Sequence, residues 1–451
     1  MKYSYNRFIF LRACAKIFDV KFKKGAKPER NSMSILTIIN IIIGSVLGLC
    51  YLYQFVFLII AYVKKQPIHD AKKINRIAVL ISARNEEGVL PELLSCLEKQ
   101  DYPRESFDVF VVADNCTDGT ADAARRCGAF VYERENKTEI GKGYAIDFLI
   151  RSIAADRGDD AYDAYLIFDA DNLVEPNFLT EINKTFSQGY DCVTSYRNSK
   201  NYGDSWIAAG QGMTFMRDLI LLNRARMLIG GCCFVAGTGF MFSRKLCRSF
   251  GGGWPFHTLT EDGEFTTHNA IEGNKLGYCD RAKFYDEQPT GLRQSCRQRL
   301  RWCKGYLQII RGYYPRLLRR IFSRDFLSCA DMALCMAPAY ILSILAVIGN
   351  IVGAVLSIVF GTPWTEVLLS LGIGIVGIYL VLLMFSLCLT ISEWRQLKTT
   401  GARKILYMFT FPLYMFTFVP ICFVALFKRN VGWKPIKHES RATLEELSGK
   451  K

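Results

Sequence analysis

The sequence predicts an α/β domain with a mainly parallel sheet, joined to a helical transmembrane region. Apolar runs of strand length alternate with helix-like stretches between Lys64 and Asp331, which is typical of a parallel sheet covered by helices. Apolar stretches of about 20 residues or more flank that block, and each is long enough to cross a bilayer. With 451 residues, 50% of them hydrophobic, and a mean hydropathy of +0.12, the chain is too apolar for a purely soluble enzyme.

The apolar stretches divide the chain into six parts. One candidate span, Ile35–Tyr62, precedes the block, and three follow it at Ala333–Phe360, Val367–Ile391 and Ile405–Phe427. We expect a basic N-terminal tail over 1–34, a span over 35–63, the α/β domain over 64–296, interfacial amphipathic helices over 297–332, three spans over 333–427 and a C-terminal tail over 428–451. That last tail is too short to bury a core, so no regulatory domain is expected there.

The formal net charge of +15 is concentrated beside the apolar stretches. This distribution favours a membrane surface, and membrane lipids as partners, over nucleic acid. We expect an integral, multi-pass protein of the cell membrane with its α/β domain in the cytoplasm. Basic flanks would place both tails on the side of that domain, which one span before it and three after it do not allow. Either one stretch does not cross, with Gly44 and Gly48 or Pro412 and Pro420 as breakers, or one tail is translocated.

The cysteines do not predict a disulfide framework. The 16 Cys have no regular spacing, so reduced thiols are expected. Cys232 and Cys233 lack a second Cys or His pair at zinc spacing, and the chain has four His, so no zinc site is expected.

Strands and helices alternate along the block in a way that locates its ligand-binding edge. Strands are expected at Arg76–Ile81, Asp108–Val112 and Tyr165–Phe168, and helices at Gly88–Lys99 and Thr120–Cys127. Ligands of such sheets bind beyond the carboxyl ends of the strands, so polar residues at these ends are candidates for a site.

Two carboxylates follow the strand Tyr165–Phe168. Asp169 and Asp171, separated by one residue, offer oxygen ligands for Mg²⁺ or Mn²⁺ and for the phosphates that such a cation bridges. A solvated polar turn is the alternative reading of this triplet.

The ends of the first two strands carry further polar groups. The first ends in Ser82–Glu87, and the second ends near Asp114, which is able to accept hydrogen bonds from a base or ribose. For Asp118 and Thr120 we favour simple helix capping. Lys142 lies between two glycines, where it either approaches a phosphate or carboxylate closely or is a solvated side chain in a flexible turn.

Thr260, Glu261 and Asp262 follow the aromatic stretch Trp254–His257. Such surroundings raise the pKa of a carboxyl group toward a value that suits a general base. The alternative is a capping box in which Thr260 is the N-cap and Glu264 reaches back.

A basic helical stretch, Gln298-Arg299-Leu300-Arg301-Trp302, leads toward the membrane. Arg suits a diphosphate and Trp suits stacking on a sugar or an acceptor. An interfacial helix with snorkelling Arg and an anchoring Trp is the alternative.

Taken in order, these motifs resemble those of the membrane-integrated glycosyltransferases of family 2, which include cellulose, chitin and hyaluronan synthases. The residues that carry the resemblance are Ala83–Glu87, Asp114, Asp169-Ala170-Asp171, Thr260-Glu261-Asp262 and Gln298–Trp302. The resemblance implies a GT-A-like (Rossmann-like) fold for the cytosolic domain and a UDP-sugar as the donor.

The resemblance also implies roles for single residues. Asp262, with Glu261 beside it, would be the catalytic base, and Asp171 with Asp169 would hold Mg²⁺ or Mn²⁺. The implied nucleotide-sugar contacts are Ala83, Arg84, Glu86, Asp114, Lys142 and Asp169, and the implied diphosphate and acceptor contacts are Gln298, Arg301, Trp302, Gly237 and Thr238. Deprotonation of an acceptor hydroxyl by Asp262 would invert the anomeric centre in one displacement.

Two departures limit this comparison. The first motif reads Ala-Arg-Asn-Glu-Glu rather than Pro-x-Tyr-Asn-Glu, and the spans are fewer than in cellulose synthases. A processive β-glycan synthase that extrudes its polymer is the favoured reading, because three spans follow the catalytic block. An enzyme that adds one sugar to a membrane lipid is the alternative. A transporter with a degenerate domain is disfavoured, because the carboxylates are present and the spans are almost free of charge.

Overall fold

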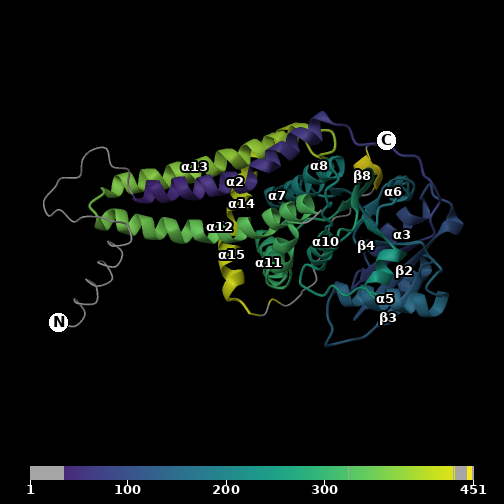
Figure 1. The fold of residues 1–451 in the computed structure, drawn as a ribbon. Coiled ribbons are helices and arrows are strands. Elements are labelled where there is room, and N and C mark those ends of the chain that lie inside the picture. Colours follow the sequence, from purple (N-terminus) through teal and green to yellow (C-terminus); the bar gives the residue numbers. More distant parts are fainter. Residues whose placement is uncertain (1–34, 323–324, 430, 432–443, 449–451) are drawn as a thin grey trace.

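The computed structural model describes residues 35–322, 325–429, 431 and 444–448. The expected N-terminal tail over 1–34 and most of the expected C-terminal tail lie outside the described residues. Figure 1 shows an α/β domain from which long helices project to one side.

The α/β domain is built on one eight-stranded sheet with the order β3-β2-β1-β4-β7-β6-β8-β5. The first four strands in that order run parallel, β7 is antiparallel to β4 and β6, and β8 is parallel to β6 and antiparallel to the edge strand β5. The strands are β1 (Ile77–Ala83), β2 (Phe107–Asp114), β3 (Phe130–Arg134), β4 (Ala164–Asp169), β5 (Leu173–Val174), β6 (Cys192–Ser199), β7 (Phe240–Ser243) and β8 (Leu276–Asp286). The expected strands β1, β2 and β4 are confirmed.

Helices cover both faces of the sheet, so the central strands are buried on both sides. In β1, Ile77 and Val79 pack into one hydrophobic core while Ala78 and Leu80 pack into the other, which explains its continuous apolar sequence. The first core is closed by α3 (Leu90–Glu98), α4 (Thr120–Arg126) and α6 (Phe178–Phe186), and the second by α5 (Lys142–Arg157), α9 (Arg244–Ser249) and α10 (Glu261–Glu272).

A second group of helices joins this domain to the membrane helices. It consists of α7 (Trp206–Phe215), the π-helical segment η2 (Met216–Leu221), α8 (Leu222–Ile229) and the long basic helix α11 (Leu292–Arg320). The remaining short elements are the 3₁₀ turn η1 (Arg104–Ser106) and α16 (Leu444–Ser448).

Four helical segments among the described residues are long and apolar enough to cross a membrane. They are α2 (Ile35–Val63), the part of α12 (Phe326–Val359) from Tyr340 onward, α13 (Trp364–Ser392) and the pair α14 (Gly401–Phe416) and α15 (Phe418–Phe427). In Figure 1, α2, α12 and α13 extend together away from the domain, whereas α14 and α15 run across the base of this bundle. One third of the most apolar window of α14–α15 is buried in the protein, against 6–11% for the other three.

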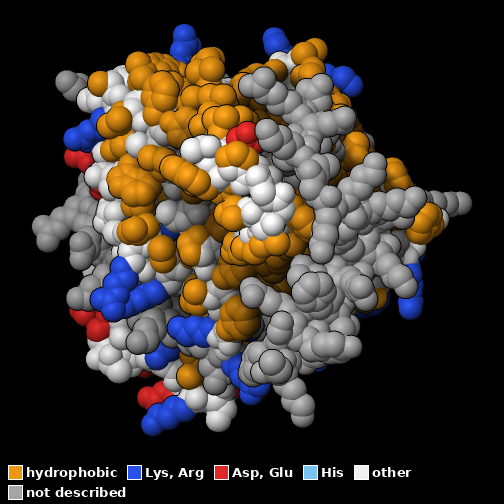
Figure 2. Space-filling view, turned by 90° about the vertical axis from the view of Figure 1, so that its left-hand side faces the viewer, with side chains coloured by type: hydrophobic (Ala, Val, Ile, Leu, Met, Phe, Trp, Pro, Cys, Tyr) orange, Lys and Arg blue, Asp and Glu red, His pale blue; other side chains and the backbone are white. Residues whose placement is uncertain are grey.

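Close helix packing holds the bundle together. Gly349 and Gly353 of α12 form a GxxxG pattern, and a Cβ atom on Gly353 would lie 2.9 Å from Ile39 of α2. Small residues at this spacing let two helix backbones approach closely in a membrane. Seen from the side of the far end of the bundle, hydrophobic side chains gather in the upper and central part of the described surface, and Lys and Arg side chains lie mainly at its rim and in its lower part (Figure 2).

Candidate active site

The loops after β1 and β2 are joined by hydrogen bonds at the carboxyl edge of the sheet. Asn85 and Asn115 adopt positive φ angles of 58° and 52°, which Asn tolerates better than most residues. The Asn85 side chain accepts the Thr117 N–H at 2.7 Å, and the Thr120 hydroxyl accepts the Glu86 N–H at 2.9 Å. The first motif, which includes Ala83 and Arg84, is therefore held against the second.

Asp118 contributes to the start of α4, as its expected capping role requires. Its carboxylate accepts the Thr120 N–H at 3.1 Å, although the N-cap position itself is Gly119. The Thr120 hydroxyl donates to the same carboxylate, so both residues order this turn.

Asp114 ends β2 as a buried carboxylate with a fixed partner. Arg134 at the end of β3 donates to it at 2.7 Å, and both side chains are less than a tenth exposed. Asn115 donates to the same oxygen at 3.0 Å. A carboxylate has two oxygens and up to four acceptor positions, so Asp114 is also able to accept a hydrogen bond from a ribose or base.

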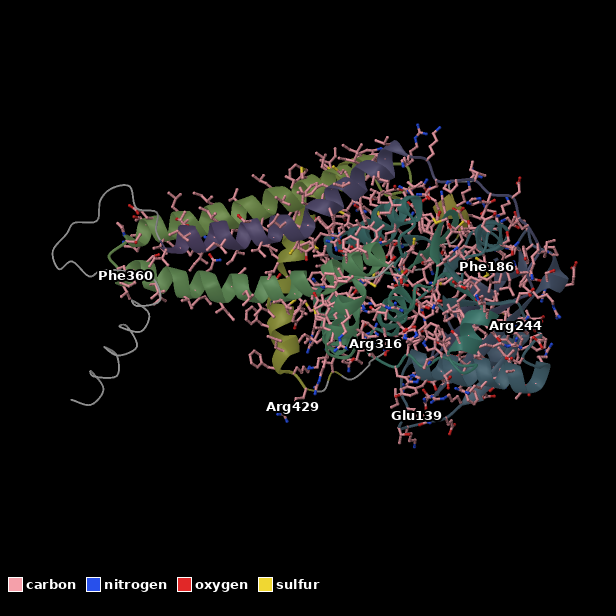
Figure 3. The ribbon with its side chains drawn as sticks, viewed as in Figure 1. Glu139, Phe186, Arg244, Arg316, Phe360 and Arg429 are labelled. Carbon is pink, nitrogen blue, oxygen red and sulfur yellow. The ribbon has the colours of Figure 1, made fainter. Side chains whose placement is uncertain are left out.

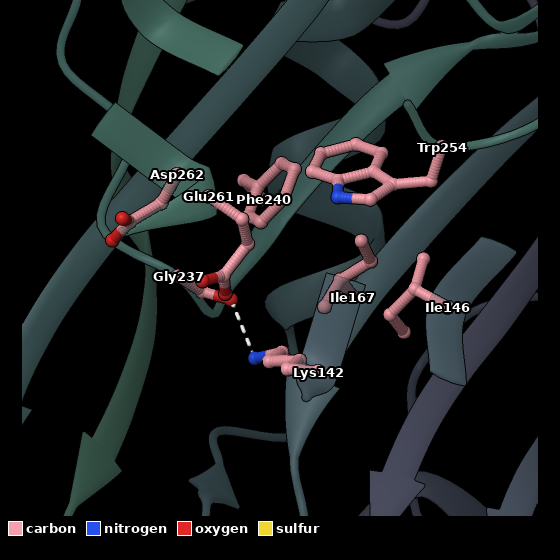
Figure 4. Close-up of a pocket in the computed structure, with 8 residues that line it drawn as sticks. All are labelled: Lys142, Ile146, Ile167, Gly237, Phe240, Trp254, Glu261 and Asp262. Carbon is pink, nitrogen blue, oxygen red and sulfur yellow. Dashed lines mark hydrogen bonds between the residues drawn. The ribbon is translucent and has the colours of Figure 1, made fainter. Parts of the chain in front are cut away.

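Lys142 is held in the site. It begins α5 after Gly141, forms an ion pair with Asp169 and donates to the Gly237 carbonyl at 2.7 Å (Figure 4). The alternative reading, a solvated lysine in a flexible turn, is therefore wrong. Gly143 allows the turn to pack tightly, because a Cβ atom there would lie 2.2 Å from the Phe256 carbonyl oxygen.

The Asp-x-Asp triplet follows β4 and contacts the segment before β7. The Asp169 N–H donates to the Thr238 hydroxyl at 2.9 Å. Asp171 is buried, and its carboxylate accepts the Glu287 N–H at 3.2 Å. Because Asp171 is buried and the Asp169 carboxylate pairs with Lys142, the triplet is not a freely solvated turn.

Asp262 and Glu261 form the first turn of α10 and line a pocket with Lys142, Gly237 and Trp254 (Figure 4). The Asp262 carboxylate accepts the Gly263 N–H at 2.8 Å. Gly237 has φ +70°, and a Cβ atom on it would lie 3.3 Å from the Asp262 carboxylate. Gly237, which the resemblance places near the acceptor, and Asp262, the expected base, are therefore neighbours.

Burial sets the proton affinity of this carboxylate pair. It raises the pKa of Asp262 above its usual range, opposed by the Gly263 N–H and the charges of Arg301 and Lys142. Burial, and then the charge of Asp262, raise the pKa of Glu261 to about 7. Two adjacent carboxyl groups with raised pKa values beside cationic side chains are typical of acid–base sites.

The alternative reading of a capping box at Thr260 is wrong. Thr260 occupies the N-cap position, but its side chain makes no capping hydrogen bond. Glu264 instead accepts the N–H groups of His257 and Thr258 at 3.1 and 3.0 Å and the Tyr313 hydroxyl at 2.9 Å. Glu264 is four residues beyond the N-cap rather than three, so the reciprocal bond of a capping box does not form.

The motif Gln298–Trp302 lies on α11 beside the site. Gln298 accepts a hydrogen bond from Gln211 at 2.7 Å, and Arg301 donates to the Leu259 carbonyl at 2.9 Å. The Trp302 ring packs edge-on against Phe215, with 5.6 Å between ring centroids. The structure thus brings Arg301 near the carboxylate pair, and it places Trp302 against α7.

Arg299, within the same motif, has a structural role. It is fully buried, lies over the rings of Tyr414 and Phe418 at 4.3 and 4.7 Å, and donates to Thr417 at 2.6 Å. This arginine therefore fastens α11 to α14 and α15.

Sequence reasoning missed Arg197 and Asp286. Arg197 in β6 donates to Asp286 at the end of β8 at 2.9 Å and lies 3.7 Å above the Phe215 ring. Burial lowers the pKa of Arg197, but the charges of Asp286, Asp169 and Asp171 outweigh burial and raise it. The signal in the sequence was a single charged residue within the buried strand CVTSYRNS, which alone does not predict a partner.

The donor chemistry of the triplet fits a divalent cation that is shared with a substrate. The described residues contain no group of three or more His, Cys, Asp or Glu side chains that would hold a metal by themselves. Mg²⁺ is usually held by one or two carboxylates together with substrate phosphates. Asp169, with 40% of its side chain exposed, and the buried Asp171 supply such carboxylates.

The chain is similar to known glycosyltransferases. A family model described as "Glycosyltransferase like family 2" matches residues 75–305. Beta-monoglucosyldiacylglycerol synthase from Nostoc sp. is 25% identical over 293 residues, which cover 62% of this chain and 60% of that protein. The synthase of the same name from Synechocystis sp. is 26% identical over 245 residues, covering 53% and 49%. The chain thus matches about half to three fifths of the length of these curated relatives.

A solved structure supports the fold. The mannosyltransferase PcManGT from Pyrobaculum calidifontis, in complex with GDP-Man and Mn²⁺, superposes with a TM-score of 0.57 at 17% identity and covers 88% of this chain and 100% of that chain. The GT-A-like fold is confirmed, whereas the narrower likeness to cellulose, chitin and hyaluronan synthases stays a prediction. Because the family model matches more than half of its residues, the chain belongs to the glycosyltransferase-like family 2.

Proposed function

We propose that the protein is an inverting glycosyltransferase that moves a sugar from a nucleotide-diphospho-sugar, with UDP-sugars the first candidates, to a hydroxyl group of a membrane lipid. The observation that carries the proposal is the pocket that Asp262 and Glu261 line together with Lys142, beside α11, the helix that leads to the membrane. We assign Asp262 as the base, because it is the carboxylate beside Gly237 and is held by the Gly263 N–H.

In the proposed reaction the acceptor hydroxyl oxygen bonds to the anomeric carbon as the bond from that carbon to the diphosphate oxygen breaks. The hydroxyl proton passes to Asp262, and the electron pair leaves with the nucleoside diphosphate. Arg301 and Lys142 lie close enough to the carboxylates to lower their pKa values, and the same charges would stabilise the leaving diphosphate. Attack opposite to the leaving group inverts the anomeric centre.

Asp169 and Asp171 would hold a divalent cation, Mg²⁺ or Mn²⁺. When bound, such an ion neutralises charge on the departing diphosphate. Asp114 and the loop from Ala83 to Glu86 lie at neighbouring strand ends, where we propose that they hold the nucleoside.

A lipid acceptor is supported by the membrane region. Helices α2, α12 and α13 all contact one another, so the space between them is a packed seam. An α-helix is about 10–12 Å across, and three mutually touching helices enclose no passage for a sugar chain. Two curated relatives are named for the synthesis of a glucosylated diacylglycerol. A processive polymer synthase, which the number of spans favoured, remains the alternative and would need further helices or a second copy to form a channel.

The orientation of α14 and α15 suggests which helices cross the membrane. We propose that α2, α12 and α13 are the spans and that α14–α15 lies along the membrane surface. Arg429, just after α15, lies at the base of the bundle, whereas Phe360 marks its far end (Figure 3). Three crossings put Lys428 and Arg429, which follow α15, on the same side as the α/β domain, whereas the basic stretch that precedes Ile35 stays on the opposite side. The conflict between basic flanks and four spans is therefore removed for the C-terminal flank and not for the N-terminal one.

Reporter fusions test this topology. A reporter fused after Lys451 should be active on the cytoplasmic side, and one inserted between Gly361 and Thr362 should be active on the opposite side. If both reporters are active on the same side of the membrane, the proposed three-span arrangement is wrong.

Product analysis tests the acceptor. Full-length protein in liposomes containing diacylglycerol is supplied with radiolabelled UDP- or GDP-sugars and Mg²⁺ or Mn²⁺, and the label is followed through lipid extraction. We expect one donor to give a lipid carrying one added sugar, and Asp262→Asn to give none. Label in material that grows beyond one sugar would refute the lipid acceptor and favour the polymer synthase.

A further inference from the structure

A second pocket lies where the membrane helices meet the α/β domain. It has a volume of about 370 Å³ and is formed by Ala61 and Tyr62 in the last turn of α2 and by residues 64–69 after it, together with parts of α6, α8 and β8. Its lining shares no residue with the pocket of Asp262. The volume is within the usual range of small-ligand sites, and the active site proposed above leaves this pocket unexplained.

The ends of two membrane helices show where this pocket lies relative to the membrane. α2 ends at Val63 and α13 ends at Ser392, and both ends lie beside α8 (Figure 1). The Tyr62 hydroxyl donates to the Cys388 carbonyl at 2.8 Å, which ties the two ends together. If α2 and α13 cross the bilayer as proposed above, the pocket lies in the headgroup layer on the side of the α/β domain.

The pocket carries an excess of positive charge. Its lining contains Lys64, Lys65, Lys184, Arg224 and Arg281 against Glu181 and Asp280. Lys184 pairs with Glu181, and Arg224 pairs with Asp280 and with Glu393. Lys64, Lys65 and Arg281 are exposed and form no ion pair with another described residue, so their charges are available to a ligand.

One buried acceptor in the lining also lacks a donor. Gln66 donates through Nε2 to the Arg224 carbonyl at 2.8 Å, which fixes the orientation of the amide. Its Oε1 is buried and accepts no hydrogen bond from any described residue. Buried polar atoms are almost always paired, so a ligand hydroxyl is a fitting donor here.

We propose that this pocket binds the headgroup of an anionic glycerophospholipid, with the phosphate beside Lys64, Lys65 and Arg281 and a headgroup hydroxyl donating to Gln66. Apolar and aromatic lining residues, among them Ala61 and Tyr278, would contact the glycerol and the first carbons of the acyl chains. The lipid would join α2, α13 and the α/β domain at one point, as a bound component distinct from the acceptor.

Binding of fluorescent phosphatidylglycerol to the full-length protein in phosphatidylcholine nanodiscs tests the proposal. Replacing Lys64, Lys65 and Arg281 by Gln together should lower the affinity by about tenfold or more. The matched control replaces Arg311, Arg319 and Lys428 by Gln, which are exposed basic residues outside the pocket, and should change the affinity by less than about twofold. An equal loss in both triple variants would mean attraction to the surface charge as a whole and would overturn the site.

Two further measurements test the contact with Gln66 and the kind of phosphate that the pocket binds. Gln66→Leu keeps every charge and should weaken phosphatidylglycerol more than phosphatidic acid, which lacks the headgroup hydroxyl; equal weakening would remove the Gln66 contact. Millimolar glycerol 3-phosphate should not displace the labelled lipid, and displacement would mean that the pocket binds a soluble phosphate ester. Because only lipid binding is measured, failure here is distinguishable from failure of the proposed transferase reaction.

Discussion

The assignment of Asp262 as the base makes the change Asp262→Asn the most informative perturbation of this protein. Asn has nearly the same shape, and its Oδ1 is able to keep the hydrogen bond from the Gly263 N–H, which measures 2.8 Å. The variant should therefore fold. It loses the attraction of Asp262 to Arg301 and Lys142, but it also loses the repulsion from Glu261. Because these two effects oppose each other, donor affinity should change by less than about threefold.

The loss of turnover should be much larger. Removal of a general base costs about 10²- to 10⁴-fold in rate, or about 3–5 kcal/mol in activation free energy. Since the amide introduced by Asp262→Asn carries no charge, the pKa of Glu261 should also fall from about 7 toward its usual range. Steady-state release of nucleoside diphosphate gives kcat, and binding of the nucleoside diphosphate by titration calorimetry gives the affinity.

A matched control separates this effect from a general cost of replacing an aspartate. Asp122 on α4 has 72% of its side chain exposed, and Asp122→Asn should leave kcat unchanged. If Asp262→Asn keeps more than about a tenth of the wild-type kcat, Asp262 is not the base, and Glu261 becomes the next group to replace.

Three other perturbations follow from the contacts. Asp171→Asn should weaken binding of a nucleoside diphosphate by about tenfold or more in the presence of Mn²⁺ and by much less without metal. If the variant and the wild type bind the nucleoside diphosphate equally well with Mn²⁺ present, Asp171 is not a ligand of the cation. Arg134→Met should leave Asp114 buried without its cation and lower the free energy of unfolding by about 3–5 kcal/mol, whereas adding Asp114→Asn should recover part of that loss in a thermal melt. Glu261→Gln should stabilise the protein more at pH 8 than at pH 5. Because the pKa of Glu261 is raised to about 7 in the folded state, the folded state binds more protons than the unfolded state between about pH 4.5 and 7. The cost of ionising Glu261 is therefore fully present only above pH 7, where it amounts to at most about 3 kcal/mol. An equal shift in melting temperature at both pH values would contradict the raised pKa.

The sequence alone predicted the parts of the fold that depend on local pattern. The strands around Val79, Val111 and Leu166 are continuous apolar runs because helices cover both faces of the sheet, and such runs are recognisable without a structure. The carboxylates at the ends of these strands were recognisable for a related reason, since parallel strands bring their carboxyl ends to one edge.

Contacts between distant segments escaped the sequence because no local pattern encodes them. Arg197 and Asp286 meet only when β6 and β8 pair across a gap of 89 positions in the chain. The capping box at Thr260 does not form, because Glu264 lies four residues after Thr260 instead of three. The direction in which α14–α15 runs across the base of the bundle depends on its packing against α7 and α11, in part through Arg299. Length and hydropathy alone do not encode that direction.

The central claim is a single displacement in which Asp262 removes the proton of the acceptor while the diphosphate leaves from the opposite face of the sugar. The anomeric configuration of the product, read from the proton coupling constant of the transferred sugar by NMR, tests it most directly. With an α-linked nucleotide-sugar as donor, we predict a β-linked sugar on the acceptor. An α-linked product would mean retention of configuration and would contradict the proposed mechanism.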